Sequence, residues 1–309
     1  MTYSGQPREV RFNLGERSLA ALEWGEAEKP LILALHGWLD NAASFSMLAP
    51  LLVDYRILAL DLAGHGQSDW RSSDAGYPVW SYVEDLRRVH LSLSSQGNPA
   101  SFSSSSASAG SLEDKLSPVA LLGHSLGAGV ASLYAATWPA SVSCVGLIEN
   151  IGPLSGPDEH FVDNLRASLE HELADKPLPR ARPFDAWVRS RVVSQFAVPL
   201  NAAERLMQRN TEIGTDGLYH FRCDPRLKNP SVVRLTEAQV QGALRQITAP
   251  VKLISGATGL KRPMTRERIE CVSYLAQIEL PGGHHLHMEE NSVYAVAEQL
   301  ALFYAELIK

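Results

Sequence analysis

The chain has 309 residues, 45% of them hydrophobic and 20% charged, which is enough to bury the large core of a globular protein. A formal net charge of -6 and the lack of a basic patch argue against a nucleic-acid partner. We expect a protein without a membrane span, because no apolar run approaches ~18 residues. We also expect it to be cytoplasmic, because no secretory signal opens the sequence. Cys144, Cys223 and Cys271 are few and far apart, which is typical of reduced thiols rather than of a disulfide framework.

Eight stretches along the chain have the pattern of strands. The first two, near residues 10–13 and 19–24, flank a turn at 15–18. The others are short apolar runs without alternation, which indicates strands buried on both faces, as in a parallel sheet. These runs cover residues 31–35, 57–60, 119–122, 145–148 and 251–255, with a weaker one at 278–280.

Helical patterns lie between the strands, at residues 81–94, 126–138 and 292–308. This alternation predicts an α/β fold in which a doubly wound, mostly parallel eight-stranded sheet carries helices on both faces. In such sheets the functional residues lie just beyond the carboxyl ends of the strands. The residues at those positions are His36, Asp61, Ser125, Glu149 and Gly256.

Two stretches interrupt the alternation. Residues from about 94 to 117 form a Ser/Ala/Gly-rich run with almost nothing to bury, which is typical of a flexible spacer. Residues 153–244 hold helix-like segments punctuated by prolines, and we interpret them as a mostly helical cap inserted between two strands. The core is then expected to comprise residues 1–152 and 245–309.

The segment Gly123-His124-Ser125-Leu126-Gly127 matches the pattern G-x-S-x-G. An apolar strand precedes it and a helix of small residues follows it, which is the context of a nucleophile elbow. The flanking glycines allow the sharp turn and the close approach of helix to strand. We therefore predict that Ser125 is an exposed nucleophile.

A serine nucleophile needs a general base, which in this chain order follows near the C-terminus. Three histidines compete there, His284, His285 and His287, and we assign His284 because it directly follows the turn at Gly282 and Gly283. Histidines at positions i, i+1 and i+3 of a loop rarely converge, and no matching ligand pattern accompanies them. We therefore expect no metal site.

The carboxylate that orients the base has two candidates. After strand 251–255, the position at which many such enzymes carry Asp is Gly259, and the first carboxylate downstream is Glu267. Glu149 instead closes an apolar strand 24 residues after Ser125 (149 − 125), where a charged residue needs a partner that an imidazolium would supply. We predict that Glu149 is the acid, with Glu267 as the alternative.

Two backbone N–H groups must stabilise the oxyanion of an acyl-transfer reaction. We assign them to Leu126, which follows the nucleophile, and to Trp38, which follows His36-Gly37. The expected lining of a substrate pocket consists of Trp38 and apolar residues of the cap, namely Phe161, Leu165, Trp187 and Phe196.

Four motifs occur in order along the chain: HGW at 36–38, ALDLAGHGQSD at 59–69, GHSLG at 123–127 and GGHHLHMEE at 282–290. With them the chain resembles the α/β-hydrolase fold superfamily. HGWLDNAASF at 36–45, the HGQSD turn and a helix carrying Asp85 resemble the serine hydrolase-like proteins within it. The acid after the sixth strand is similar to that of one group of haloalkane dehalogenases, but those use an Asp nucleophile where this chain has Ser125.

We therefore predict a serine hydrolase that cleaves a carboxylic ester or related acyl bond of a small molecule. It would use no cofactor, and it would act as a monomer or homodimer. One alternative is a cofactor-free perhydrolase or carbon–carbon bond hydrolase, which would use the same three residues. A second is a non-catalytic ligand-binding protein of this fold, against which an intact Ser–acid–His set argues.

Overall fold

A computed structural model describes residues 6–95, 116–173, 179–261 and 264–308. Most of the Ser-rich stretch predicted at about 94–117 lies outside the described residues. The predicted eight-stranded sheet is confirmed, with strand order β1-β2-β4-β3-β5-β6-β9-β10. The strands are β1 (Arg8–Asn13), β2 (Ser18–Trp24), β3 (Leu31–Leu35), β4 (Arg56–Leu60), β5 (Val119–His124), β6 (Val142–Ile148), β9 (Val251–Gly256) and β10 (Leu275–Leu280).

The sheet is mostly parallel. Strand β2 pairs antiparallel with β1 and with β4, whereas the pairs from β4 through β3, β5, β6 and β9 to β10 are all parallel. The parallel strands are the apolar runs of the sequence, and alternate side chains serve opposite faces. Leu33 of β3 packs in one hydrophobic cluster, and Ile32 and Ala34 pack in the other.

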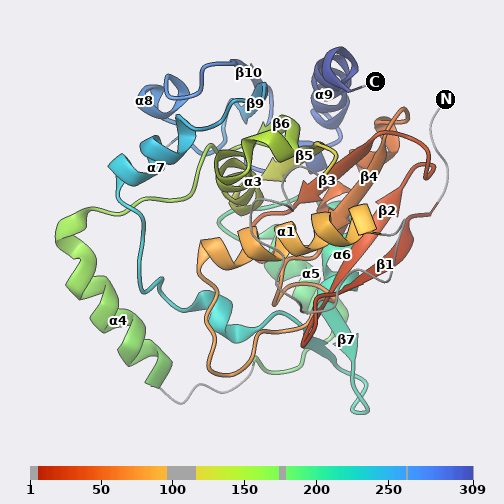
Figure 1. The fold of residues 1–309 in the computed structure, drawn as a ribbon. Coiled ribbons are helices and arrows are strands. Elements are labelled where there is room, and N and C mark those ends of the chain that lie inside the picture. The colour runs from red at the N-terminus through yellow and green to blue at the C-terminus, as the bar shows by residue number, and fades with distance from the viewer. Residues whose placement is uncertain (1–5, 96–115, 174–178, 262–263, 309) are drawn as a thin grey trace.

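Helices cover both faces of the sheet (Figure 1). On one face lie α1 (Val79–Ser95), α3 (Leu126–Thr137) and α7 (Glu237–Leu244), all of which contribute to one cluster. The other face is covered by α9 (Val293–Leu307), whose Leu300 and Tyr304 are completely buried. The short helix α8 (Arg266–Ile269) joins β9 to β10.

The chain between β6 and β9 holds the segment predicted as a cap. Its elements are α4 (Phe161–Leu173), α5 (Phe184–Val192), α6 (Leu200–Asn210) and a small hairpin of β7 (Thr211–Ile213) and β8 (Tyr219–Phe221). The hairpin is an addition to the helices that the sequence predicts. Val240 and Leu244 of α7 pack in the core cluster with α3, so α7 is joined to the core by its packing. The division at residues 153 and 244 stays a prediction.

No helix in the described ranges is both long enough and apolar enough to cross a bilayer. The three cysteines are all free thiols, and Cys144 and Cys223 are buried.

Candidate active site

Ser125 occupies the tight turn between β5 and α3. Its φ of 50° and ψ of −111° are a conformation that costs a non-glycine residue free energy and that must be held by its surroundings. Its N–H donates to the carbonyl of Ile148 at 3.0 Å, and Asn150 Nδ2 donates to its carbonyl at 2.8 Å. A Cβ on Gly127 would lie 2.0 Å from the carbonyl oxygen of Leu35, so the turn requires glycine there.

The structure brings Ser125, His284 and Glu149 into one row. His284 Nε2 lies 3.1 Å from Ser125 Oγ, and His284 Nδ1 lies 3.0 Å from Glu149 Oε2. The side chain of His284 is 8% exposed and that of Glu149 is fully buried. A row of hydroxyl, imidazole and carboxylate can pass the hydroxyl proton to the imidazole while the carboxylate stabilises the resulting cation.

Glu149 is held in place by the loop that follows β9. The backbone N–H groups of Gly256 and Leu260 each donate to its carboxylate at 2.6 Å. A Cβ on Gly259 would lie only 2.2 Å from both carboxylate oxygens, because the Glu149 carboxylate fills the space that a side chain at 259 would need. Glu267 is exposed on α8, and within the described chain it makes no hydrogen bond to His284.

The three histidines of the 284–287 loop converge, which the sequence analysis did not expect. They gather around a fourth histidine, His124, whose ring centroid lies 4.9 Å from that of His284, 5.0 Å from that of His285 and 4.3 Å from that of His287. Nitrogen atoms of His124, His284 and His285 lie within 4.8 Å of one another. They are the residues here that could approach a metal ion, but both nitrogens of His284 already face Ser125 and Glu149.

His124 was not singled out from the sequence, although it is the variable residue of the G-x-S-x-G pattern. Its Nε2 lies 2.9 Å from the carbonyl oxygen of His284, so this nitrogen carries the proton and donates it to the main chain of His284. Burial, with His287, His284 and His285 nearby, holds the pKa of His124 well below its usual value. A neutral ring therefore supports the loop that carries His284.

The ring nitrogens of His285 and His287 make no hydrogen bond to Ser125 within the described residues. His285 Nε2 lies 3.2 Å from Asp40 Oδ2, and burial lowers its pKa. His287 is completely buried beside Phe45, and neither of its ring nitrogens has a hydrogen-bond partner in the described part of the chain. Burial lowers the pKa of His287 to about 3.

An ion pair ties the last turn of α5 to the floor of the site. Arg191 Nη2 donates to Asp40 Oδ1 at 2.6 Å and lies 3.0 Å from His285 Nε2. Burial alone would raise the pKa of Asp40, but Arg191 and His285 beside it hold that pKa well below the usual value. Arg191 Nη1 also donates to the carbonyl of Phe196 at 2.9 Å, and the Phe196 ring lies 4.8 Å from the ring of His284.

The other predicted pocket residues have different surroundings. The Trp38 ring is half exposed, and its Nε1 donates to the carbonyl of Leu227 at 3.0 Å. Trp187 is buried inside the cap, stacked on Phe221 at 5.1 Å. Phe161 is 47% exposed and Leu165 partly exposed on α4, which stands away from the sheet (Figure 1).

The two predicted oxyanion donors belong to neighbouring segments. Leu126 is the first residue of α3, and Trp38 follows β3 by three residues. The N–H of Gly127 donates to the carbonyl of His36 at 3.0 Å, which fixes the loop after β3 beside the start of α3. A Cβ on Gly37 would lie 2.9 Å from His124 Nδ1, so the glycine of the HGW motif permits this close packing.

The model of the alpha/beta hydrolase family matches residues 32–299. The chain belongs to this family. A serine hydrolase-like protein of Dictyostelium discoideum is 30% identical over 93% of this chain and 79% of its own length. The crystal structure of a hypothetical protein from Pseudomonas aeruginosa PAO1 is 35% identical, covers 96% of this chain and 99% of its own, and superposes with a TM-score of 0.84. A 3-hydroxybutyrate-oligomer hydrolase of Cupriavidus necator is 26% identical over 92% of this chain and 93% of its own length.

Proposed function

We propose that this protein is a serine hydrolase that cleaves a carboxylic ester or a related acyl bond through an acyl-enzyme. The observation that carries the proposal is the continuous row from Ser125 Oγ through the imidazole of His284 to Glu149, with separations of 3.1 and 3.0 Å. Its setting at the turn between β5 and α3 adds support, because the helix N-terminus favours developing negative charge.

In the proposed reaction Ser125 Oγ attacks the acyl carbonyl while His284 Nε2 takes the hydroxyl proton. The backbone N–H groups of Leu126 and Trp38 would donate to the oxyanion of the tetrahedral intermediate. Collapse of that intermediate expels the alcohol, which receives the proton from His284 and leaves an acyl ester on Ser125. Water then attacks this ester, again with His284 as base, and releases the acid. Glu149 stabilises the imidazolium in both halves.

The substrate side of the proposal rests on two aromatic residues, Phe196 beside His284 and Trp38 in the loop after β3. The Phe196 ring lies 4.8 Å from that of His284, and the Trp38 ring is half exposed. An apolar wall beside the base suits a small-molecule acyl group. The name of the Cupriavidus relative describes hydrolysis of 3-hydroxybutyrate oligomers, which is compatible with acyl-bond cleavage by this chain. Three free cysteines support a cytoplasmic setting.

The test is hydrolysis of p-nitrophenyl esters of increasing acyl length, together with labelling by a fluorophosphonate. We expect p-nitrophenol release and a single labelled peptide that contains Ser125. Ser125→Ala should lower kcat on the order of 10⁴-fold or more and abolish labelling, because the nucleophile is lost. Ser273→Ala, at an exposed serine before β10, is the matched control and should keep both activity and labelling. Folded wild-type protein that is neither labelled nor active on any ester would contradict the proposal.

A further inference from the structure

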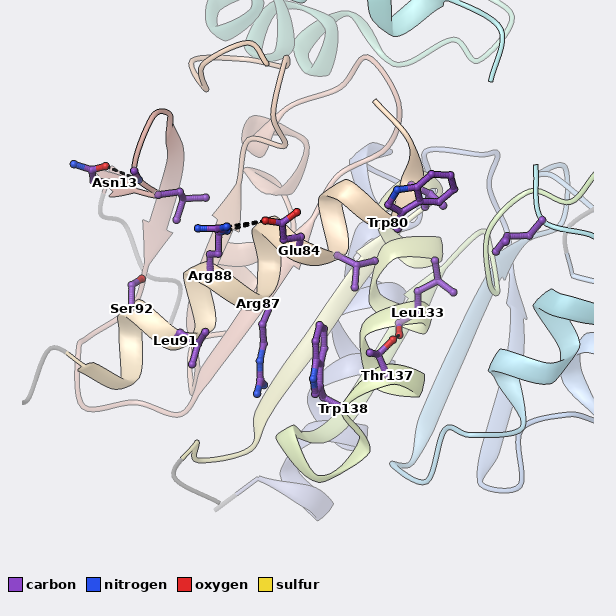
Figure 2. Close-up of a pocket in the computed structure, with 15 residues that line it drawn as sticks. Asn13, Trp80, Glu84, Arg87, Arg88, Leu91, Ser92, Leu133, Thr137 and Trp138 are labelled. Atoms are coloured by element: carbon purple, nitrogen blue, oxygen red, sulfur yellow. Dashed lines mark hydrogen bonds and ion pairs between the residues drawn. The ribbon is translucent and has the colours of Figure 1, made fainter. Parts of the chain in front are cut away.

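A cavity of about 930 Å³ lies between α1 and α3, and Ser125 is not among the residues that line it. Figure 2 shows this cavity. Its walls come from those two helices, from the turn between β1 and β2, and from Leu235 before α7. Ser125 precedes the first residue of α3, whereas the α3 residues that line the cavity, Leu133 and Thr137, lie in its second half. At 1.5 Å per residue, about 12 to 18 Å of helix separates them from the proposed active site.

The lining of this cavity is mainly apolar and aromatic. Trp80 of α1 leaves 50% of its surface exposed, and Trp138 at the end of α3 lines the same cavity. Val83 and Leu133 also line the cavity, and Leu133 lies between the two tryptophans in Figure 2. A half-exposed tryptophan beside an apolar wall is expected where a ligand covers it, and the volume is that of a small-molecule site.

Arg87 supplies the one buried charge in this lining. Its guanidinium lies 4.7 Å over the Trp138 ring and donates to Ser141 Oγ at 3.0 Å and Tyr134 Oη at 3.4 Å, both neutral acceptors. Arg87 is only 9% exposed, yet no carboxylate of the described residues lies within ion-pair distance of it. A buried cation without a counter-charge is costly, so its setting favours an anion.

The other buried arginines in the described ranges provide an internal comparison. Arg71 is paired with Asp85, Arg209 is paired with Asp61 at 2.8 Å, and Arg268 is paired with Glu237 at 2.7 Å. Arg87 differs from all three because its surroundings offer hydroxyl groups and an indole face in place of a carboxylate. The cavity is therefore the open side from which an anionic group can reach it.

We propose that this cavity binds an amphiphilic monocarboxylate, with the carboxylate on Arg87 and an apolar body along the wall between Trp80 and Trp138. A guanidinium presents parallel N–H groups that match a carboxylate. A single negative charge fits better than a phosphate dianion, because the only other arginine of the lining, Arg88, is already paired with Glu84 at 2.8 Å. This site is independent of ester hydrolysis at Ser125.

Decanoate is the probe, titrated into the full-length protein by calorimetry at pH 7. Arg87→Gln should weaken its binding about tenfold or more, because the charge-assisted contact is lost. Arg166→Gln, at an exposed arginine of α4 that lies outside the cavity lining and is paired with Asp163, is the matched control and should leave binding within about twofold. Decanol, which has the same chain and no charge, should bind weakly and equally to wild type and Arg87→Gln.

A second measurement locates the chain of the ligand. Fluorescence of the tryptophans should be quenched by 10-bromodecanoate, and Trp80→Phe should remove a measurable part of that quenching. Because Trp80 is half exposed, this variant keeps the test open if Arg87→Gln does not fold. No binding at millimolar decanoate would overturn the proposal. So would binding that is unchanged in Arg87→Gln but blocked by a fluorophosphonate on Ser125, or a dimer in sedimentation that Trp80→Ala dissociates.

Discussion

The core and the cap contribute to the site around Ser125 by different means. On the core side, hydrogen bonds to main-chain groups set the geometry. The N–H of Ser125 donates to the carbonyl of Ile148, its carbonyl accepts from the Asn150 side chain, and Glu149 accepts two backbone N–H groups from the end of β9 and the loop after it. On the cap side, two ion pairs attach helices to the core, Arg191 with Asp40 and Arg209 with Asp61.

This difference has a consequence for what mutation can change. Backbone contacts in the core hold the proposed nucleophile, base and acid in one arrangement, so a change there alters the chemistry. The segment between β6 and β9 is held largely by side-chain contacts, which include these ion pairs and the hydrogen bonds of Trp38 and Asn41 to the carbonyls of Leu227 and Leu206. A change there should first alter how substrate is enclosed and only then the chemistry. Both halves of this comparison can be tested.

The largest effect is expected at the acid. Glu149→Gln removes the charge that stabilises the imidazolium of His284, and kcat for ester hydrolysis should fall on the order of 10⁴-fold with KM little changed. Steady-state kinetics on a p-nitrophenyl ester measures both values. Glu267→Gln is the matched control at the alternative acid and should keep full activity, since Glu267 is exposed. Full activity of Glu149→Gln would remove Glu149 from the mechanism.

The position of the acid can also be tested at Gly259, where many related enzymes carry Asp. Gly259→Asp alone should lower both stability and activity, because its Cβ would lie 2.2 Å from the Glu149 carboxylate oxygens. In the background Glu149→Ala that space is free, so Glu149→Ala/Gly259→Asp should recover about tenfold or more of the activity lost in Glu149→Ala. If the double variant is no better than Glu149→Ala, a carboxylate at 259 cannot reach His284 in this loop.

The next effect concerns the attachment of the cap. Arg191→Gln leaves Asp40 buried without its cation, which should cost about 3–5 kcal/mol of stability or release the 191–196 segment. If Phe196 is released, KM should rise more than kcat falls. Steady-state kinetics measures KM and kcat, and urea unfolding measures the loss of stability, so the two outcomes can be told apart. Arg189→Gln is the control, because its ion pair with Asp185 is exposed and should contribute at most ~0.5 kcal/mol. An unchanged KM and stability in Arg191→Gln would show that this ion pair does not hold the cap.

Features set by local sequence could be predicted from the sequence alone, whereas contacts between residues far apart in the chain could not. The strands and the turn at Ser125 were predictable because apolar runs and glycines are local signals. The prediction of Glu149 depended on Gly259, whose missing side chain the structure explains by the carboxylate that fills its place. The pairing of Arg191 with Asp40 was not predictable, since 151 residues separate them and neither lies in a sequence motif that indicates an ion pair. The gathering of histidines on His124 was missed for the same reason.

The smallest effect per residue, between pH 7 and pH 5, concerns the buried histidines, which lie in the core. Burial lowers the pKa of His36 to about 4 and those of His65 and His287 to about 3. Below pH 6.5 the unfolded chain therefore binds protons that the folded chain does not, so the free energy of unfolding should fall as the pH drops from 6.5 toward 4. Each histidine contributes up to about 1.4 kcal/mol per pH unit to this slope.

His287→Leu tests this argument at one site. Since neither ring nitrogen of His287 has a hydrogen-bond partner in the described chain, the substitution loses no hydrogen bond and should leave stability at pH 7 unchanged or raised. Its advantage over wild type should then grow by about 1 kcal/mol per pH unit below 6.5, measured by urea unfolding at pH 7, 6 and 5. His220→Leu, at an exposed histidine of the cap hairpin, should show no such growth. Equal slopes for wild type and His287→Leu would mean that His287 takes up its proton in the folded core.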